Sequence, residues 1–236
     1  MGMADGTPVG RRVVLGMLAA GVGGVLFGSK AATVLERVVA PLALRDGTGL
    51  LSLFPVGRFR FYSVTGPVPA RSEAEYRLAV GGAVATPLTL TLADLRALPV
   101  TRLTEDFVCV TGWRVHDVKW KGVRLSELLD RAGVAGSAQG VLFRSFDGLY
   151  TETLSLAQAR RDDVIVAYEM EGGPVIHDHG GPVRLYCAPM FGYKSIKWLD
   201  RIELTEADPG PGYWANRGYD IDGWLPGAEG RVDRPG

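Results

Sequence analysis

The pattern of hydrophobic and polar positions changes near residue 59, and this change divides the chain into a short first part and a long remainder. Apolar residues fill positions 13–28 almost without interruption, and positions 31–42 repeat apolar residues at helical spacing. Positions 43–58 hold several glycines and are expected to form a loop. We therefore predict a leader over residues 1–40, a linker over 41–58 and a folded domain over 59–236.

Within the predicted domain, short β-prone runs indicate strands, and leucine-rich runs indicate short helices. Alternation of apolar and polar residues marks the strands, and Gly or Pro follows most of them. Leu125, Leu128 and Leu129 share one helical face, and Gly133 follows as a C-terminal cap. Strands are predicted over 59–64, 76–80, 87–92, 103–110, 140–146, 164–170, 183–187 and 196–204, helices over 92–98, 125–132 and 154–161, and a hairpin-like piece over 118–123.

These elements favour an α+β fold with a mixed β-sheet core, short helices and a single compact domain. Strands outnumber helices, and few connections have the form of a regular βαβ crossover. The 236 residues are 47% hydrophobic, which is enough for one sizeable core. The 32 glycines and 14 prolines follow no repeating period, so they indicate many tight turns rather than a fibrous chain.

Charge and cysteine content exclude several classes of protein. Lys plus Arg and Asp plus Glu number 26 each, so the formal net charge is zero. A balanced chain lacks the basic surface typical of nucleic-acid binding, and we expect no nucleic-acid partner. The 2 cysteines are too few for a disulfide framework or an iron–sulfur site.

The leader has the features of an export signal. Arg11 and Arg12 directly precede the apolar run 13–28, as in a twin-arginine signal. The alternative is a signal anchor that stays in the membrane, with the arginines as positive-inside charges. We expect an exported protein that is periplasmic or extracytoplasmic, either free or anchored by residues 13–28. The twin-arginine route carries folded proteins, often with a cofactor inserted, so this signal favours a cofactor.

Cys109 lies at the end of a predicted strand, and a Thr-Gly turn follows it directly. A residue in this position is well placed to reach a pocket. Three interpretations stay open from the local sequence. Cys109 is a buried core residue, because cysteine packs as a small hydrophobe; or it forms a disulfide with Cys187, which export would permit; or it is a ligand or nucleophile.

A Gly-rich segment over 179–199 places cations among apolar residues. Arg184, Lys194 and Lys197 need partners if they are buried, and no acidic residue follows in sequence until Asp200. An anionic ligand such as a phosphate would supply that partner. The alternative is that the lysines extend to solvent from a half-buried sheet. Two nearby histidines at i and i+2 are weak evidence for zinc, because no third ligand follows at a recognised spacing.

Five ordered segments carry a family resemblance, namely Cys109–Trp113, Val118–Leu125, Ala167–Gly172, His179–Arg184 and Gly192–Leu199. Together they resemble the molybdopterin-binding domain of the sulfite oxidase superfamily over roughly residues 59–224. The similarity is closest to the exported bacterial branch, which includes the catalytic subunit of the periplasmic methionine sulfoxide reductase. The resemblance implies a sulfite-oxidase-type molybdopterin-binding fold and an oxidoreductase.

The resemblance also implies a cofactor and its binding residues. The cofactor is molybdenum held by a single pyranopterin, with the Cys109 thiolate as the protein ligand to the metal. His179 and Arg184 match positions that touch the pterin. The remaining implied cofactor contacts are Gly192, Tyr193 and Lys194 at the phosphate end, their neighbours Ser195 and Lys197, a hydroxyl from Ser145, and Tyr62 and Ser63 from an early strand.

Departures from the family pattern shape the expected reaction. Thr111–Arg114 replaces the Gly-Asn-Arg-type sequence that supplies arginines for sulfite, and His179 replaces an asparagine of the methionine sulfoxide reductase branch. No C-x-x-C-H haem motif occurs, so we expect a redox partner, a haem or quinone-linked membrane protein. The expected activity is two-electron oxygen-atom transfer on a small sulfur or nitrogen oxide, with Trp113 and His116 as candidates to face the substrate.

Two alternatives to this enzyme stay open. The first is a non-catalytic exported binding module on the same scaffold, which a Cys109–Cys187 disulfide would mark. The second is a membrane-anchored electron-transfer subunit, supported by the apolar run 13–28 alone.

Overall fold

Two β-sheets with short helices form the part of the chain that the computed structural model describes, Phe59 and residues 63–228. These residues belong to one unit that begins at Phe59. The leader over 1–40, the linker over 41–58 and Tyr62 lie outside the described residues, so these assignments stay predictions.

The first sheet is mixed, as the sequence predicts. Its strands follow the order β2-β1-β10-β5-β6. Strands β1 and β10 run parallel, and the other neighbours run antiparallel. The strands span Leu88–Leu90 (β2), Leu78–Gly82 (β1), Leu199–Thr205 (β10), Gly140–Ser145 (β5) and Thr151–Ser155 (β6).

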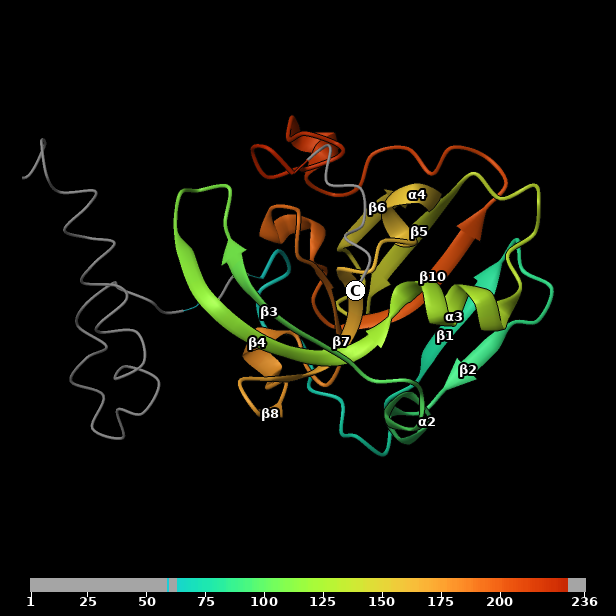
Figure 1. Ribbon diagram of the computed structural model, residues 1–236, viewed down its shortest axis with the longest axis horizontal. Coiled ribbons are helices and arrows are strands. Elements are labelled where there is room, and N and C mark those ends of the chain that lie inside the picture. Colours follow the sequence, from blue (N-terminus) through green and yellow to red (C-terminus); the bar gives the residue numbers. More distant parts are fainter. Residues whose placement is uncertain (1–58, 60–62, 229–236) are drawn as a thin grey trace, which may run out of the picture. The chain divides into compact units, whose positions relative to one another are not determined.

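The second sheet is antiparallel and is centred on β7. Strand β4 pairs with β3 on one side and β7 on the other, while β8 and β9 both pair with the far edge of β7. In Figure 1 the β3–β4 hairpin is a long curved ribbon at the left of the coloured chain. The strands span Thr101–Val108 (β3), Arg114–Arg124 (β4), Val164–Met170 (β7), Gly173–Pro174 (β8) and Arg184–Cys187 (β9).

Short helices with clear end signals connect the strands. Capping boxes of Thr91 with Asp94 and of Ser155 with Gln158 begin two of them. Gly133 ends a third at a φ of 66°, a left-handed conformation that favours glycine. Among the described residues, no helix has the length and apolar content needed to cross a membrane. The helices are α2 (Leu92–Ala97), α3 (Leu125–Ala132), α4 (Leu156–Ala159), and the 3₁₀ turns η2 (His177–His179), η3 (Gly192–Lys194) and η4 (Ala215–Arg217).

Strand β7 is buried on both faces, which explains its continuous apolar sequence. Val164 and Val166 pack into one cluster with the leucines of α3 and residues of the first sheet. Ile165 and Ala167 point the other way, into a smaller cluster of β3, β4 and β9 residues that includes Trp120. Successive side chains of a strand face opposite sides, so β7 separates two cores.

Three predicted elements differ from the structure. The piece over 118–123 is the middle of the long strand β4 rather than a hairpin, because it pairs with β3 on one edge and β7 on the other. The helix predicted over 154–161 is shorter, α4 over Leu156–Ala159, because strand β6 continues to Ser155, which caps the helix. Of the strand predicted over 59–64, the structure describes Phe59, Ser63 and Val64, and none of the three lies in a strand.

Removal of a core leucine from α3 should destabilise the fold strongly. Leu129 is fully buried, so Leu129→Ala should lower the free energy of unfolding by about 3 kcal/mol through lost burial and a residual cavity. The matched control in the same helix is Arg131→Ala, whose ion pair with Glu127 is exposed and contributes about 0.5 kcal/mol or less. Urea unfolding measures both changes, and similar losses would contradict the assigned core.

Candidate functional site

Loops from both sheets meet at one pocket of about 220 Å³. This volume is several times the ~30 Å³ that one water occupies, so the pocket is large enough for part of a ligand. The turn after β3, the β5–β6 turn, η2, β9, η3 and the segment around η4 all contribute. The lining residues are Phe59, Ser63, Val64, Phe107, Cys109, Val110, Thr111, Trp113, Asp147, Tyr150, Asp178, His179, Arg184, Gly192, Tyr193, Ser195, Lys197, Trp198, Trp214 and Tyr219.

A tight turn presents Cys109 to this pocket. Strand β3 ends at Val108, and the Cys109 N–H donates to the Trp113 carbonyl at 2.9 Å. The Gly112 N–H donates back to the Cys109 carbonyl at 3.0 Å, with the glycine at a φ of 93°. The Cys109 Sγ lies 3.2 Å from the Thr111 hydroxyl, and the residue is half-buried. The turn therefore offers a fixed, accessible thiol.

Cys187 has a different environment from Cys109. It is fully buried, and both cysteines are free, so the Cys109–Cys187 disulfide that would mark a binding module is contradicted. Strand alternation gives the reason, because Leu185 and Cys187 pack in the large cluster while Tyr186 packs with Phe107 in the small one. Burial raises the pKa of the Cys187 thiol well above its ordinary value. Cys187 is therefore a neutral core residue.

Arg184 supplies a buried positive charge at the pocket. Its Nη1 donates to the His179 carbonyl at 2.7 Å, and its Nη2 donates to the Ser195 carbonyl at 2.8 Å. The guanidinium lies 5.4 Å from the ring centroids of both Phe107 and Trp120. No carboxylate of the described residues pairs with it. Burial lowers the pKa of Arg184 to about 10, so it stays a cation at neutral pH.

The charge of Arg184 also contributes to lowered pKa values of Lys197 and His179. The Lys197 Nζ donates to the Asp178 carbonyl at 3.2 Å and lies 4.1 Å from the Trp198 ring centroid. Burial, and then the charge of Arg184, lower the pKa of Lys197 to about 7. Burial, followed by Arg184 and Lys197, lowers the pKa of His179 to about 4. Burial disfavours either sign of charge, so only the smaller effect of Arg184 on these pKa values favours an anion here.

Asp147 and Asp178 also line the pocket, and the Asp147 carboxylate accepts hydrogen bonds within its own turn. The Asp147 Oδ1 accepts the backbone N–H groups of Leu149 at 2.9 Å and Tyr150 at 2.8 Å. Asp178 and Asp147 both raise the pKa of Lys197, but their effects are smaller than those of burial and Arg184. Burial is therefore the main cause of the lowered pKa of Lys197.

The segment over 192–195 approaches the aromatic wall closely. A Cβ on Gly192 would lie 2.4 Å from the Phe107 ring, so only glycine fits there. The Tyr150 hydroxyl donates to the Tyr193 carbonyl, and the Ser195 hydroxyl accepts the Cys187 N–H at 2.9 Å. Hydrogen bonds from two other elements thus hold this segment at the pocket.

Most of the predicted site residues meet at the pocket, but Lys194 and Ser145 do not line it. Lys194 is fully buried, and its Nζ donates to the Glu152 Oε1 at 2.7 Å. The anionic partner of Lys194 is thus not a ligand phosphate but the carboxylate of Glu152, which belongs to strand β6, far from Lys194 in sequence. Ser145 is buried too, and its hydroxyl accepts the Asp147 N–H at 3.1 Å.

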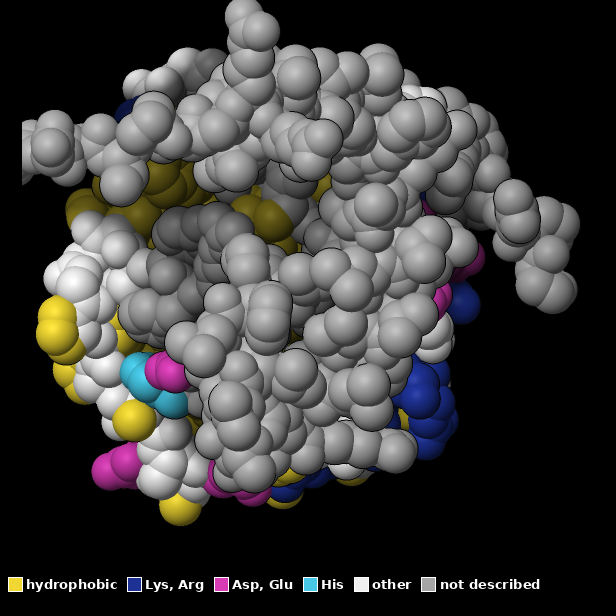
Figure 2. Space-filling model, turned by 90° about the vertical axis from the view of Figure 1, so that its left-hand side faces the viewer, with side chains coloured by type: hydrophobic (Ala, Val, Ile, Leu, Met, Phe, Trp, Pro, Cys, Tyr) yellow, Lys and Arg dark blue, Asp and Glu magenta, His cyan; other side chains and the backbone are white. Residues whose placement is uncertain are grey.

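Aromatic residues that the sequence analysis did not assign complete the pocket wall. The Phe59 ring centroid lies 5.0 Å from that of Phe107 and 4.9 Å from that of His179. Trp214 and Tyr219 come from the Gly- and Pro-rich tail, where the aromatic content was the available signal. Figure 2, which faces the left side of Figure 1, shows hydrophobic side chains at the upper left and Lys and Arg at the lower right.

His116, predicted as a candidate for the substrate pocket, does not line it. Its Nδ1 lies 3.0 Å from the Asp106 Oδ2, on the β3–β4 hairpin. Within the part of the chain that the structure describes, no three His, Cys, Asp or Glu residues are grouped to bind a metal. A zinc site at the two histidines of η2 is therefore unsupported.

A half-buried thiol and an unpaired buried cation in one pocket define a particular class of site. A soft thiolate binds metals that are already held by sulfur, and the cations suit an anionic group such as a phosphate. The residues present therefore fit an anionic cofactor that carries a thiolate-binding metal.

Comparisons with known proteins agree with this class. The family described as "Oxidoreductase molybdopterin binding domain" matches residues 65–214. The uncharacterized oxidoreductase YuiH of Bacillus subtilis is 34% identical over 160 residues, which cover 67% of this chain and 80% of YuiH. Mitochondrial sulfite oxidase of Mus musculus is 32% identical over 181 residues, which cover 65% of this chain and 33% of that protein. The chain thus spans only about a third of that oxidase.

A solved structure shares the fold. The sulfane dehydrogenase SoxCD of Paracoccus pantotrophus superposes with a TM-score of 0.56 at 24% identity, covering 64% of this chain and 45% of that one. The chain belongs to the molybdopterin-binding oxidoreductase domain family, within the sulfite oxidase superfamily. It is an oxidoreductase whose cofactor is molybdenum–molybdopterin.

Anion binding to the cofactor-free protein should depend on pH through Lys197. Its pKa of about 7 must rise when an anion binds, so above about pH 7 binding requires uptake of one proton. The association constant for sulfate should then fall about tenfold per pH unit up to about pH 9. Calorimetry with sulfate measures this slope without titration of the ligand itself.

Two variants distinguish the effect of Lys197 on sulfate binding from a general effect of removing one positive charge. Lys197→Met should bind sulfate more weakly and without the slope. Lys121→Met is the control, since Lys121 pairs with Glu169 and does not line the pocket, and it should keep the slope. A pH-independent association constant in the unchanged protein would contradict the assignment.

Proposed function

We propose that the chain is an exported oxidoreductase that transfers an oxygen atom in a two-electron reaction on a small sulfur or nitrogen oxide, with Cys109 as the molybdenum ligand. The observation that carries the proposal is the position of the Cys109 thiol at a pocket that also holds the buried guanidinium of Arg184. The family assignment supplies the cofactor, and the pocket supplies a soft ligand and positive charge for it.

Several residues of this pocket would hold the cofactor. Arg184 and Lys197 would balance the negative charge of its phosphate, and Ser195 and the backbone at Gly192 and Tyr193 would contact it by hydrogen bonds. His179, neutral because of its low pKa, would contact the pterin without adding charge. Ser63 also lines the pocket and would border the cofactor. When bound, molybdenum supplies the two-electron redox chemistry.

Cys109 and its turn would orient the metal end of the cofactor. The thiolate form of cysteine is the one that coordinates a metal such as molybdenum. The Thr111 hydroxyl, 3.2 Å from the Sγ, is placed to donate to that thiolate. The backbone hydrogen bonds of this turn, from Cys109 to Trp113 and from Gly112 to Cys109, also fix the position of the thiol.

The substrate side of the pocket favours a small molecule without net charge. Among the described residues that line the pocket, the only Lys and Arg are Lys197 and Arg184, which the proposal assigns to the cofactor. The neighbours of Cys109 in the lining are instead the uncharged residues Val110, Thr111 and Trp113. A sulfoxide or an N-oxide presents a polar oxygen and an apolar remainder to such a wall, whereas sulfite would require more cations.

Electrons would come from a separate redox partner, a haem or quinone-linked membrane protein. The resemblance to the exported branch supports this. Export by the twin-arginine route, with residues 13–28 either cleaved or retained as an anchor, would place the enzyme in the same compartment as that partner.

Replacement of the proposed ligand should abolish turnover without unfolding the protein. The wild-type chain, expressed in a host that makes the cofactor, should hold about one molybdenum per chain. Cys109→Ser should lose at least about 10³-fold in dye-linked turnover of a sulfoxide, because a soft ligand to the metal is lost. Elemental analysis, circular dichroism and a screen of sulfoxides, N-oxides and sulfite provide the measurements.

Cys187→Ala is the matched control, because Cys187 is a buried core thiol outside the pocket lining. It should retain molybdenum and activity. Full turnover by Cys109→Ser would refute the assigned ligand. Less than about a tenth of a molybdenum per wild-type chain would refute the proposed enzyme.

The export route has its own test. Arg11→Lys together with Arg12→Lys keeps the positive charge but removes the paired arginines. The enzyme should then stay in the cytoplasmic fraction, whereas replacement of Lys30 by Arg should leave its distribution unchanged. Cell fractionation with activity measurement decides, and continued export of the double variant would contradict the twin-arginine route.

A further inference from the structure

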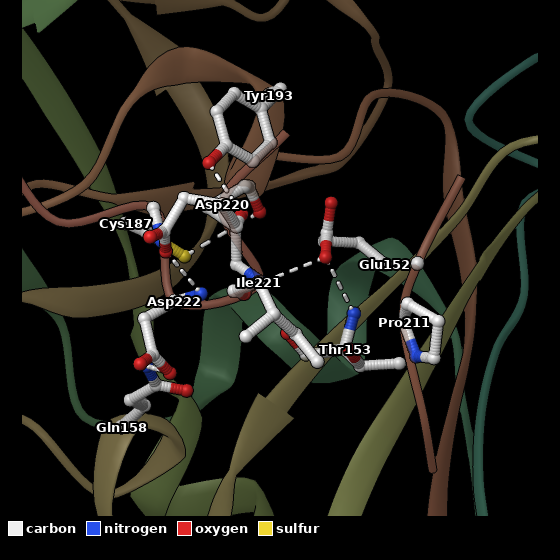
Figure 3. Close-up of polar contacts among 12 residues, drawn as sticks. Glu152, Thr153, Gln158, Cys187, Tyr193, Pro211, Asp220, Ile221 and Asp222 are labelled. Atoms are coloured by element: carbon white, nitrogen blue, oxygen red, sulfur yellow. Dashed lines mark hydrogen bonds and ion pairs between the residues drawn. The ribbon is translucent and has the colours of Figure 1, made fainter. Parts of the chain in front are cut away.

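A fully buried ion pair lies beside the pocket but not in it. The Nζ of Lys194 and the Oε1 of Glu152 are 2.7 Å apart, and both side chains have 0% exposure. The same Nζ donates to the carbonyls of Thr153 and Ile221, at 2.6 Å each. In Figure 3, Glu152, Thr153 and Ile221 lie around this contact. The ammonium thus uses its three donors on protein groups, one of them in the tail.

That tail is a segment over residues 209–225, which we name the C-terminal strap. Hydrogen bonds fix it at both ends, from the Tyr213 N–H to the Thr151 carbonyl at 2.8 Å and from the Leu225 N–H to the Pro189 carbonyl at 3.0 Å. Near its middle, the Tyr193 hydroxyl donates to the Asp220 carbonyl at 2.7 Å, a contact drawn in Figure 3. The strap therefore packs on β6 and on the segment that precedes and includes η3.

Two glycines let the strap lie directly on the ion pair. A Cβ on Gly212 would be 2.6 Å from the Glu152 Oε1 and 2.9 Å from the Glu152 Cα. A Cβ on Gly223, which has a φ of 65°, would be 2.7 Å from the Lys194 Cγ and 2.8 Å from the Tyr193 hydroxyl. The close fit on both sides means that the ion pair and the strap cannot move independently.

The ion pair connects two walls of the pocket. Lys194 belongs to η3, and its neighbours Tyr193 and Ser195 line the pocket on one side. The strap contributes Trp214 and Tyr219 to the lining. The family match ends at residue 214, so Tyr219 lies beyond the shared domain.

We infer that Lys194 is a positioning residue: its pair with Glu152 and its bond to Ile221 hold the C-terminal strap in place, so that Trp214 and Tyr219 complete the pocket beside Tyr193, where the cofactor phosphate would bind. The role in cofactor binding rests on the proposed function, whereas the anchoring role does not. Lys194 thus acts on the cofactor pocket through the protein rather than through contact with a phosphate.

Replacement of both members of the pair separates anchoring from stability. A single change leaves an unpaired buried charge and destabilises the whole fold, whereas an apolar pair of similar volume is often neutral. Lys194→Met with Glu152→Leu should therefore lower the melting temperature less than Lys194→Met alone, because it removes buried hydrogen bonds but leaves no unpaired charge. It removes the bond to Ile221, so the strap should still open more readily.

Hydrogen exchange of the cofactor-free, full-length protein measures that opening. Peptides containing the Tyr213 and Leu225 amides should exchange about tenfold faster in the double variant, the factor expected from loss of one to two hydrogen bonds. Peptides of β10 should be unchanged. Unchanged exchange in the strap of a folded double variant would overturn the inference.

A second variant disturbs the strap from its own side. Gly212→Ala adds a Cβ against Glu152 and should produce the same faster exchange, even if the double variant does not fold. Gly136→Ala is the control, because its Cβ would have no neighbour within 4 Å and its φ is not positive. Protected strap amides in Gly212→Ala would also count against the inference.

Cofactor retention by the loaded enzyme tests the role in cofactor binding. Gly212→Ala should release molybdenum about tenfold faster than the wild type, the factor expected from loss of one to two hydrogen bonds. Trp214→Ala and Tyr219→Ala should act in the same way, and Gly136→Ala should not. Unchanged release from all three strap variants would overturn this role. A wild type without molybdenum would remove the proposed enzyme, while the exchange result would still decide the anchoring.

Discussion

The buried positive charge of two neighbouring segments is the constraint on which the rest of this structure depends. Arg184 and Lys194 are both removed from water, and each would cost several kcal/mol if nothing compensated it. The protein compensates them differently. Lys194 has a carboxylate and two carbonyls, so its charge is neutralised within the fold. Arg184 has carbonyls and aromatic faces but no carboxylate among the described residues, so its charge remains for a ligand.

Strand alternation decides which side chains reach the pocket. In β9, Arg184 and Tyr186 share the face that contacts Trp120, whereas Cys187 faces the large core. The same alternation in β7 gives the protein two cores on either side of one strand. A one-residue shift of register in β9 would exchange the guanidinium and the buried thiol, so the pairing of β7 with β9 is as important for the site as any residue in it.

The sequence predicted the elements whose signals are local. The apolar face and the C-terminal glycine of α3 are contained within nine residues, and β7 has the continuous apolar sequence of a strand with two buried faces. It missed the full length of β4 because His116 and Asp117, the latter at a φ of 52°, break the alternation between Val115 and Val118. The partner of Lys194 could not be found by a search for nearby acids, because Glu152 is brought to it by the fold. The place of Trp214 and Tyr219 in the pocket could not be predicted either, because they lie in an irregular tail without a periodic pattern.

The uncompensated charge of Arg184 has a consequence for how the protein acquires its cofactor. A cofactor-free chain in a cell does not meet pure water, and its pocket attracts the small anions of the cytoplasm, which screen the guanidinium and Lys197. Insertion of the cofactor then displaces these small anions from the pocket. Several mobile ions leave when one large polyvalent group enters, and their release adds a favourable entropy. A high salt concentration would oppose this exchange, so the loading of the protein with its cofactor would depend on the ionic strength around it.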